Sequence, residues 1–278
     1  MTPSPLISVV VPSYNNADYI RETIDSILTQ DFDDFELIVA DHSSTDGTAD
    51  ILREYESTGR LTLVHTEAGG GAERNFNAVS RLATGKYLKL VPGDDVLKPG
   101  ILTRQVALLE ANPSATVVAC PREFIDSRGS TVLARRGLQG LRAPMPGSEA
   151  IRRVIRAGSN LLGEPACVTI RRDVLELDNL WFFDFPFLVD QATYLRALVH
   201  GEFVPDLEVG AAFRMNSGQW SVALTGKQSE QVRAFHEWFH LTHPDIVTRA
   251  DLVIGNARAA IMAQVRKLSY VILKNRMG

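Results

Sequence analysis

The sequence predicts an α/β fold with a mostly parallel, doubly wound sheet, a mixed second half and helices at its C-terminal end. Short apolar, β-branched runs recur through the first 120 residues, as they do in strands that are buried on both faces of a sheet. Amphipathic stretches with helical spacing separate these runs, and the connections between them are short. This alternation is typical of parallel strands that are joined by helices.

The first strand is expected at residues 6–12, where LISVVVP is apolar and rich in valine. The following stretch, residues 16–30, has isoleucines at helical spacing, and Asn16 or Asp18 is the expected N-cap. Pro99 is expected in the first turn of a later helix. Further strands are expected at 35–41, 61–66, 87–91 and 116–120, and further helices at 44–56, 72–83 and 99–112.

The pattern is looser after residue 120. The stretch FIDSRGSTVL predicts a hairpin with Arg128 and Gly129 at its turn, and residues 135–148 are expected to form a loop. The remaining expected elements are a helix at 148–158, a strand running into a helix at 164–175, a helix at 187–201, a strand with a polar loop at 211–221, and helices from about 227 onward. We divide the chain into two halves of one domain, 1–120 and 121–225, and a helical extension, 226–278.

Composition excludes some classes of protein. The 278 residues carry a formal net charge of −4, which argues against a nucleic-acid-binding protein. The two cysteines, Cys120 and Cys167, lie in apolar runs and are expected to be buried thiols in a reducing compartment. We see no signal peptide and no apolar stretch of the ~20 residues that span a bilayer. The expected location is the cytoplasm, with peripheral membrane contact at most.

Two carboxylates, Asp94 and Asp95, directly follow the strand expected at 87–91. Ligands of doubly wound sheets bind beyond the carboxyl ends of the strands, so this is a place for a binding site. Adjacent carboxylates repel each other and need a counter-charge, and hard oxygen ligands suit Mg²⁺ or Mn²⁺. The alternative is a solvated turn that precedes the next helix.

Other polar residues at the expected strand ends fit a nucleotide. Tyr14 offers a flat face on which a base can stack, and Asp41 can accept a hydrogen bond from a base or a ribose hydroxyl. Arg74 follows three glycines and can pair with a base carbonyl or a phosphate. The alternative is that these residues only form the turns between strands and helices.

Residues 5–48 and 69–100, with weaker similarity up to about residue 221, resemble the inverting family 2 glycosyltransferases, which have the GT-A fold. The resemblance implies that a sugar moves from a nucleotide diphosphate sugar to an acceptor hydroxyl with inversion. It also implies a divalent metal, Mg²⁺ or Mn²⁺. Carried over by position, Pro12, Tyr14, Asp41 and Arg74 hold the nucleoside, Asp94 and Asp95 the metal and diphosphate, Asp190 is the catalytic base, and Arg214 lies near the diphosphate.

The chain departs from the family pattern at four positions. Pro92 replaces the first acid of the metal motif, and His42 replaces an acid after Asp41. Val189 stands where a glutamate usually precedes the base, and Asn216 where many relatives have histidine. None of these departures removes the expected base, but together they leave room for a specialised or impaired enzyme. The resemblance further implies a UDP or dTDP sugar, with GDP as an alternative, a carbohydrate or lipid-linked acceptor, and a role in bacterial cell-surface polysaccharide, glycolipid or glycoconjugate synthesis.

Three alternatives remain open. The departures motivate a non-catalytic binder of nucleotide sugars, and a nucleotidyltransferase on a similar fold is another alternative, although PSYNNADY does not look like its basic glycine-rich loop. The motif HEWFH, with His236, His240 and His243 at helical spacing and Glu237 as the base, suggests a zinc peptidase.

The C-terminal tail has no acidic residue after Asp251, and its basic residues alternate with apolar ones. It predicts either a terminal helix packed on the domain or an interfacial helix on an anionic membrane.

Overall fold

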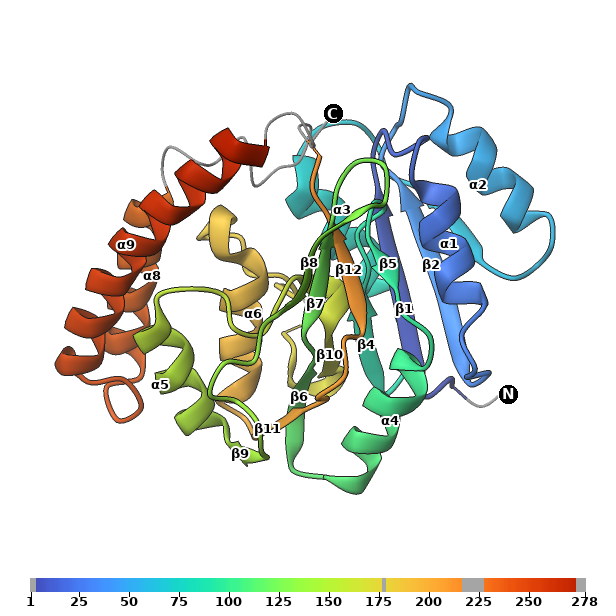
Figure 1. Cartoon of the computed structure of the whole chain (residues 1–278). Helices are drawn as coiled ribbons and strands as arrows, with labels where there is room; N and C mark the ends of the chain where they lie inside the picture. The colour runs from blue at the N-terminus through green and yellow to red at the C-terminus, as the bar shows by residue number, and fades with distance from the viewer. Residues whose placement is uncertain (1–3, 177–178, 217–227, 274–278) are drawn as a thin grey trace.

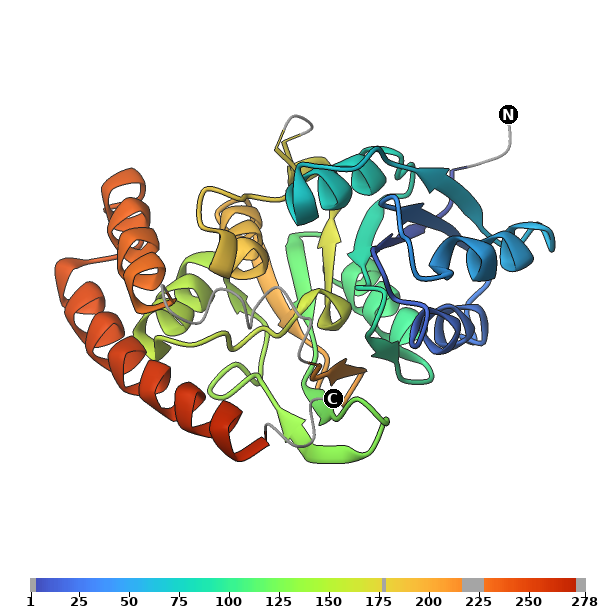
Figure 2. The same cartoon turned by 90° about the horizontal axis from the view of Figure 1, so that it is seen from above.

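The computed structural model describes residues 4–176, 179–216 and 228–273. Among them, eight strands form one sheet in the order β3-β2-β1-β4-β10-β6-β11-β9, and four form a second sheet in the order β5-β12-β7-β8. Helices α1 and α3 lie on opposite faces of the large sheet (Figures 1 and 2). The elements are β1 Ile7–Ser13, α1 Ile20–Leu28, β2 Phe35–Asp41, α2 Thr48–Glu56, β3 Thr62–His65, α3 Gly71–Arg81, β4 Tyr87–Leu90, β5 Val96–Leu97, α4 Ile101–Ala111, β6 Ala115–Ala119, β7 Arg122–Ile125, β8 Thr131–Arg136, β9 Met145–Pro146, α5 Gly147–Ala157, η1 Pro165–Cys167, β10 Val168–Arg171, η2 Arg172–Val174, η3 Pro186–Leu188, α6 Val189–Leu198, β11 Glu202–Pro205, β12 Ala211–Arg214, α8 Gln228–Thr242 and α9 Arg249–Leu273.

The N-terminal half is a parallel sheet centred on β1. Strand β1 pairs in parallel with β2 on one side and with β4 on the other, and all seven of its residues are buried. Its last residue, Ser13, lies opposite Asp41, the last residue of β2. The carboxyl ends of these two strands are therefore level at one edge of the sheet, as the sequence predicts.

The parallel order is interrupted beyond β4. Strand β10 runs antiparallel between β4 and β6, so the fourth and fifth strands expected from the sequence are not neighbours. Strand β11 then pairs in parallel with β6. The two halves of the chain thus share one mixed sheet.

The second sheet holds the predicted hairpin. Strands β7 and β8 pair antiparallel around Arg128 and Gly129, and β12 lies between β7 and β5. The prediction of a loop at 135–148 is wrong in part, because β8 runs to Arg136 and β9 occupies residues 145–146. Leu138 and Leu141 are buried, which fixes the connection between these strands to the core.

Two expected helix starts are also wrong. Tyr19, not Asn16 or Asp18, is the N-cap of α1, and no side chain caps this helix. Asn16 instead uses its side chain to accept hydrogen bonds from Ser13 Oγ at 3.1 Å and from Tyr14 N at 3.0 Å. Helix α4 starts after Gly100, so Pro99 precedes its first turn.

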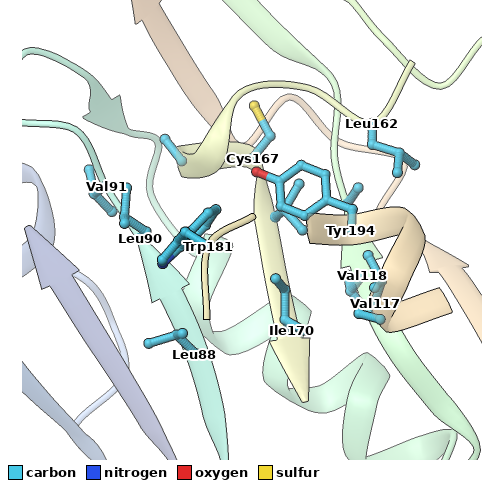
Figure 3. Packing of buried hydrophobic residues seen from close by; sticks show 14 of the residues in the cluster. Leu88, Leu90, Val91, Val117, Val118, Leu162, Cys167, Ile170, Trp181 and Tyr194 are labelled. Carbon is cyan, nitrogen blue, oxygen red and sulfur yellow. The ribbon is translucent and has the colours of Figure 1, made fainter. Parts of the chain in front are cut away.

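The core between the sheet and helix α6 is tightly filled (Figure 3). Trp181 and Tyr194 are almost completely buried there beside side chains of β4, β6 and β10. The Trp181 indole donates a 2.8 Å hydrogen bond to Ser80 Oγ, so its one polar atom is satisfied.

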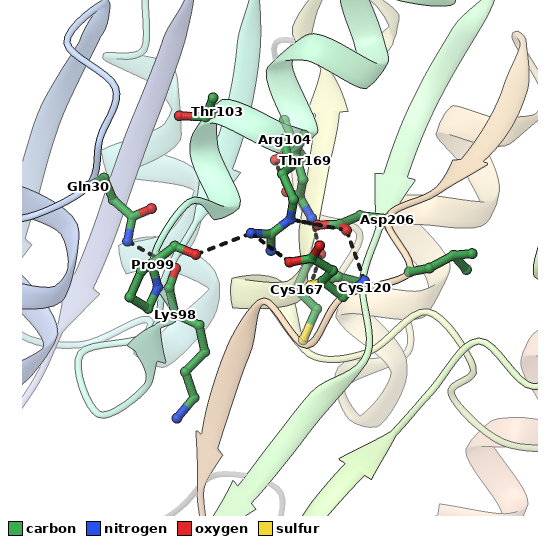
Figure 4. A network of polar contacts seen from close by, with 12 residues as sticks. Gln30, Lys98, Pro99, Thr103, Arg104, Cys120, Cys167, Thr169 and Asp206 are labelled. Atoms are coloured by element: carbon green, nitrogen blue, oxygen red, sulfur yellow. Dashed lines mark hydrogen bonds and ion pairs between the residues drawn. The ribbon is translucent and has the colours of Figure 1, made fainter.

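A polar network holds the segment that leads into the N-terminus of α4 (Figure 4). Arg104 pairs with Asp206 at 3.1 Å and donates to the carbonyl of Pro99 at 3.2 Å, and Gln30 donates to the carbonyl of Lys98 at 3.1 Å. These contacts anchor the segment that follows Asp95. The two cysteines are buried free thiols, as expected, and Cys120 Sγ lies 3.3 Å from the carbonyl of Cys167.

The C-terminal segment is helical, as predicted. Helices α8 and α9 pack on each other, and α5 packs on α9 (Figure 1). Within the described ranges, none of the helices combines the length and the apolar character needed to cross a bilayer.

Candidate active site

Tyr14 and Asp41 lie at the level ends of β1 and β2. The Tyr14 ring is 56% exposed and meets His42 edge to face, with 6.0 Å between ring centroids. Asp41 is buried; its Oδ2 accepts from Ser44 N at 3.4 Å and lies 3.5 Å from His65 Nδ1. Its Oδ1 has no hydrogen-bond partner within the described parts of the chain. An aromatic face and a free acceptor atom therefore occupy this edge.

Pro12 and Arg74 flank this edge. Pro12 is buried in β1 opposite Ala40, where it shapes the strand end. Arg74 lies in the first turn of α3 and pairs with Glu67 at 2.9 Å. Gly70, which precedes the helix, has a φ of 74°, and a side chain there would lie 2.8 Å from Arg74 Cβ. Only glycine gives both this turn and this position of the arginine.

The loop that carries Asp94 and Asp95 packs against the end of β1. Thr23 of α1 donates to the carbonyls of Gly93 at 3.1 Å and of Asp95 at 2.8 Å. A Cβ atom at Gly93 would lie 2.5 Å from Asn16 Oδ1, so the loop packs directly on the side chains of the turn after β1. The carboxylate pair thus lies beside the turn that presents Tyr14.

Asp95 is buried and incompletely bonded. Its Oδ1 accepts from Arg214 N at 3.1 Å, whereas its Oδ2 has no hydrogen-bond partner among the residues that the structure describes. Burial and the neighbouring Asp94 raise the pKa of Asp95 well above its usual value. A charge left in this state is costly unless a cation joins it.

Arg214 connects β12 to the carboxylate pair. Its Nε donates to the carbonyl of Asp94 at 2.9 Å, its Nη2 pairs with Glu22 at 2.5 Å, and its guanidinium stacks over the Tyr19 ring. Asn216, the position at which many relatives have histidine, donates to Asp94 Oδ2 at 2.8 Å. The structure therefore brings Arg214 to Asp94 and Asp95, with its guanidinium already bonded to protein groups.

Asp190 lies in the first turn of α6 and is half-buried. Asn160 Nδ2 donates to its Oδ2 at 2.8 Å, and Gln191 N donates to its Oδ1 at 2.7 Å. Burial and the Glu164 carboxylate raise the pKa of Asp190 to about 7, against the opposing effects of the Gln191 amide and Arg122. A carboxyl group with this pKa can take up a proton near neutral pH.

Sequence reasoning missed Glu164 and Arg122. The Arg122 guanidinium binds Glu164 through two nitrogens, with Nε 2.5 Å from Oε2 and Nη2 3.1 Å from Oε1. The Glu164 charge contributes to the raised pKa of both Asp95 and Asp190, so it lies close enough to influence both carboxyl groups. The only signal was an acid in GEPAC, and its partner lies 42 residues away along the chain.

The carboxylate pair fits a divalent cation. Asp95 Oδ2 is a buried oxygen without a partner among the described residues, and Asp94 directly precedes it in the loop. Within the described parts of the chain, no group of three or more His, Cys, Asp or Glu side chains is arranged to hold a metal. Two carboxylates alone suit Mg²⁺ or Mn²⁺ that completes its shell with water and substrate phosphates.

The histidines of HEWFH have structural partners. His236 is fully buried and lies 2.8 Å from Asn256 Oδ1, and His240 Nδ1 lies 2.6 Å from the carbonyl of Val247. His243 stacks on Phe239. Burial lowers the pKa of His236 and His243. These contacts favour a packed helix over a zinc site.

Comparisons with known proteins agree with this architecture. The family described as glycosyl transferase family 2 matches residues 8–177, more than half of the chain. TuaG of Bacillus subtilis, named as a candidate glycosyltransferase of teichuronic acid biosynthesis, is 40% identical over 106 residues, which are 38% of this chain and 42% of TuaG. The uncharacterised protein MT1568 of Mycobacterium tuberculosis is 34% identical over 72% of this chain and 65% of its own. The chain thus spans less than two thirds of either relative.

Two solved structures have the same fold. TarS of S. aureus, in complex with UDP-GlcNAc, superposes with a TM-score of 0.65 at 20% identity, covering 84% of this chain and 66% of that one. The mannosyltransferase PcManGT of Pyrobaculum calidifontis, in complex with GDP-Man and Mn²⁺, also gives 0.65 at 20% identity, covering 98% and 76%. The family match and these superpositions lead to one conclusion: the chain belongs to glycosyl transferase family 2 and has the GT-A fold.

Proposed function

We propose that this protein is an inverting, metal-dependent glycosyltransferase. It moves a sugar from a nucleotide diphosphate sugar to the hydroxyl of a carbohydrate or lipid-linked acceptor, in the synthesis of a bacterial cell-surface polysaccharide, glycolipid or glycoconjugate. The observation that carries the proposal is the buried Asp95 Oδ2, which has no hydrogen-bond partner among the described residues and lies beside Asp94 and Arg214. This buried carboxylate oxygen is suited to a divalent cation.

The sugar donor binds at the ends of β1 and β2. Its base stacks on the exposed Tyr14 ring, and Asp41 Oδ1 accepts from a base N–H or a ribose hydroxyl. Arg74 adds a positive charge beside the nucleoside. Neighbours of the same fold bind UDP-GlcNAc, UDP and GDP-Man, which supports a nucleotide sugar. We favour UDP or dTDP as the carrier.

Asp94 and Asp95 hold Mg²⁺ or Mn²⁺, with Arg214 fixing the loop that carries them. When bound, the cation offsets the negative charge of the leaving diphosphate.

Asp190 accepts the proton of the acceptor hydroxyl. The hydroxyl oxygen forms a bond to the anomeric carbon while the bond from that carbon to the diphosphate oxygen breaks, and the diphosphate leaves on the opposite face. One such displacement inverts the anomeric configuration. Asn160 holds Asp190 in place. The raised pKa of Asp190, about 7, makes its carboxylate a stronger base than an ordinary aspartate.

Cys120 and Cys167 are buried free thiols, which supports a protein that functions in a reducing compartment. We therefore place it in the cytoplasm. We also propose that α9 can touch the membrane surface. Its basic residues beyond Val265 have side chains outside the described part of the chain.

A nucleotide-sugar screen tests the proposal. Thermal stability is measured with UDP, dTDP and GDP sugars, each with and without Mn²⁺, and hydrolysis and transfer are then followed for the sugar that stabilises the protein. We expect Mn²⁺-dependent donor binding and turnover. Asp190→Asn should keep the donor binding and lose nearly all turnover, whereas the matched surface variant Asp33→Asn should keep both. Binding without any turnover would instead support the non-catalytic alternative, which Pro92 and His42 motivate. The absence of binding to every donor would overturn the proposal.

A further inference from the structure

A basic cavity lies where β8 joins the connection to β9. Its volume is about 210 Å³, several times the ≈ 30 Å³ that one water occupies in the liquid. Three arginines, Arg135, Arg136 and Arg142, line it together with Leu138 and Leu207. No residue proposed above for the sugar donor or the metal lines this cavity.

The positive charges of this cavity have no carboxylate partner in the described part of the chain. Arg135 donates to the carbonyl of Leu207 at 3.0 Å, and Arg136 stacks over Phe124. Within residues 4–176, 179–216 and 228–273, none of the three arginines forms an ion pair with a carboxylate. Burial and the nearby Arg122 lower the pKa of Arg136, although Glu164 opposes this effect. An anion in the cavity would offset the partly buried positive charge of Arg136, beside the exposed Arg135 and Arg142.

Two contacts join the wall of the cavity to the elements that hold Asp190. Leu138 N donates a 2.7 Å hydrogen bond to the carbonyl of Leu161, the residue after Asn160, which binds Asp190. On the other side, Arg122 Nη1 donates to the carbonyl of Arg136 at 3.5 Å. Arg122 also forms an ion pair with Glu164. The cavity is thus connected to the proposed base, and it belongs to the half of the chain away from Tyr14 and Asp41.

We propose that this cavity binds a phosphate group of the acceptor, so that the acceptor is a phosphate-bearing carbohydrate or a lipid phosphate. The inference rests on the proposed function and specifies its acceptor. A guanidinium donates to two oxygens at once, and a phosphate monoester presents three unesterified oxygens, so it can engage more than one arginine. A carboxylate presents only two. Leu207, which is exposed, offers apolar surface to the carbons beside the phosphate.

Titration with glycerol 3-phosphate in the absence of divalent cations tests the proposal on the full chain. We expect calorimetry to show binding that glycerol does not reproduce. Arg142→Gln, at an exposed position, and Arg136→Gln should each weaken it by roughly tenfold or more, as for the loss of a charge-assisted hydrogen bond. Arg53→Gln, which removes the same charge from α2, should leave it unchanged. Melting temperatures check that the variants fold, and the exposed position of Arg142 makes Arg142→Gln a mild change.

Flotation with vesicles that contain phosphatidic acid, a lipid phosphate monoester, distinguishes the two sources of phosphate. Binding to vesicles that Arg142→Gln removes, without binding of glycerol 3-phosphate, would support a lipid-borne phosphate. The inference is overturned if neither probe binds, or if both variants bind like the parent chain. Donor binding and hydrolysis by the parent chain are measured separately. A chain that hydrolyses a nucleotide sugar but fails the phosphate tests loses only this inference, and one that binds no sugar donor loses the proposed function.

Discussion

Replacing Asp190 by asparagine separates the proposed proton-accepting role from folding. Burial and Glu164 raise the pKa of Asp190 from 3.8 to about 7 in the folded chain. A difference of one pKa unit is worth about 1.4 kcal/mol, so ionised Asp190 costs the folded state up to about 4 kcal/mol, less whatever water screens at the half-buried carboxyl. Asparagine never ionises, and Asp190→Asn avoids this cost.

The size of this stability difference between Asp190→Asn and the parent chain depends on pH. Below about pH 4 Asp190 is protonated in both states, and the two proteins differ only through the altered bonds to Asn160 and Gln191. Between about pH 4 and 7 only the unfolded chain ionises Asp190, so the free energy of unfolding of the parent chain falls relative to that of the variant. Above about pH 7 the difference is constant.

Urea unfolding of both proteins across this pH range measures the difference directly. The free energy of unfolding of Asp190→Asn minus that of the parent should rise with pH and then level off, while sugar transfer by the variant falls by ~10²–10⁴-fold. Parallel curves of stability against pH would refute the raised pKa of Asp190. Full transfer activity of the variant would refute its role as the base.

Three further predictions concern the neighbouring charges. Asp95→Ala should weaken Mn²⁺-dependent donor binding by roughly tenfold or more and spare metal-free binding, as followed by calorimetry; equal loss in both conditions would contradict a metal role. Glu164→Gln should move the acidic limb of the pH–rate profile to lower pH, because a charge that raises the pKa of Asp190 is removed. Arg122→Met should lower the free energy of unfolding by about 3 kcal/mol in urea titrations, since Glu164 loses its partner; a change near zero would show that the pair contributes little.

The N-terminal half was predictable from the sequence because its signals are local. A valine-rich run buried on both faces, such as β1, has few alternatives to a central parallel strand. The place of β10 was not predictable. The sequence of β10, VTIR, has the composition of a strand. Its pairing with β4 and β6, however, depends on packing between segments that are far apart in the chain. Helix starts failed for a similar reason, because Asn16 binds Ser13 and Tyr14 instead of capping α1.

The candidate site was predictable only where the family motif names residues. Asp94, Asp95 and Arg214 meet as the resemblance implies. No motif in the sequence identifies Glu164. Its effect on Asp190 depends on burial and on the pairing with Arg122, which the linear sequence does not show. The cavity at Arg136 likewise exists only once β8 and the segment around Leu161 come together.

The insertion of β10 between β4 and β6 constrains how this protein can be made and rearranged. Tyr87 and Leu88 pair with Arg171 and Ile170, so a ribosome must complete more than 80 further residues before the edge of β4 is covered. A truncated product ending near residue 120 would leave that edge open to other chains and prone to aggregate. Chimaeras that exchange the two halves of such enzymes should therefore transfer β10 together with β4.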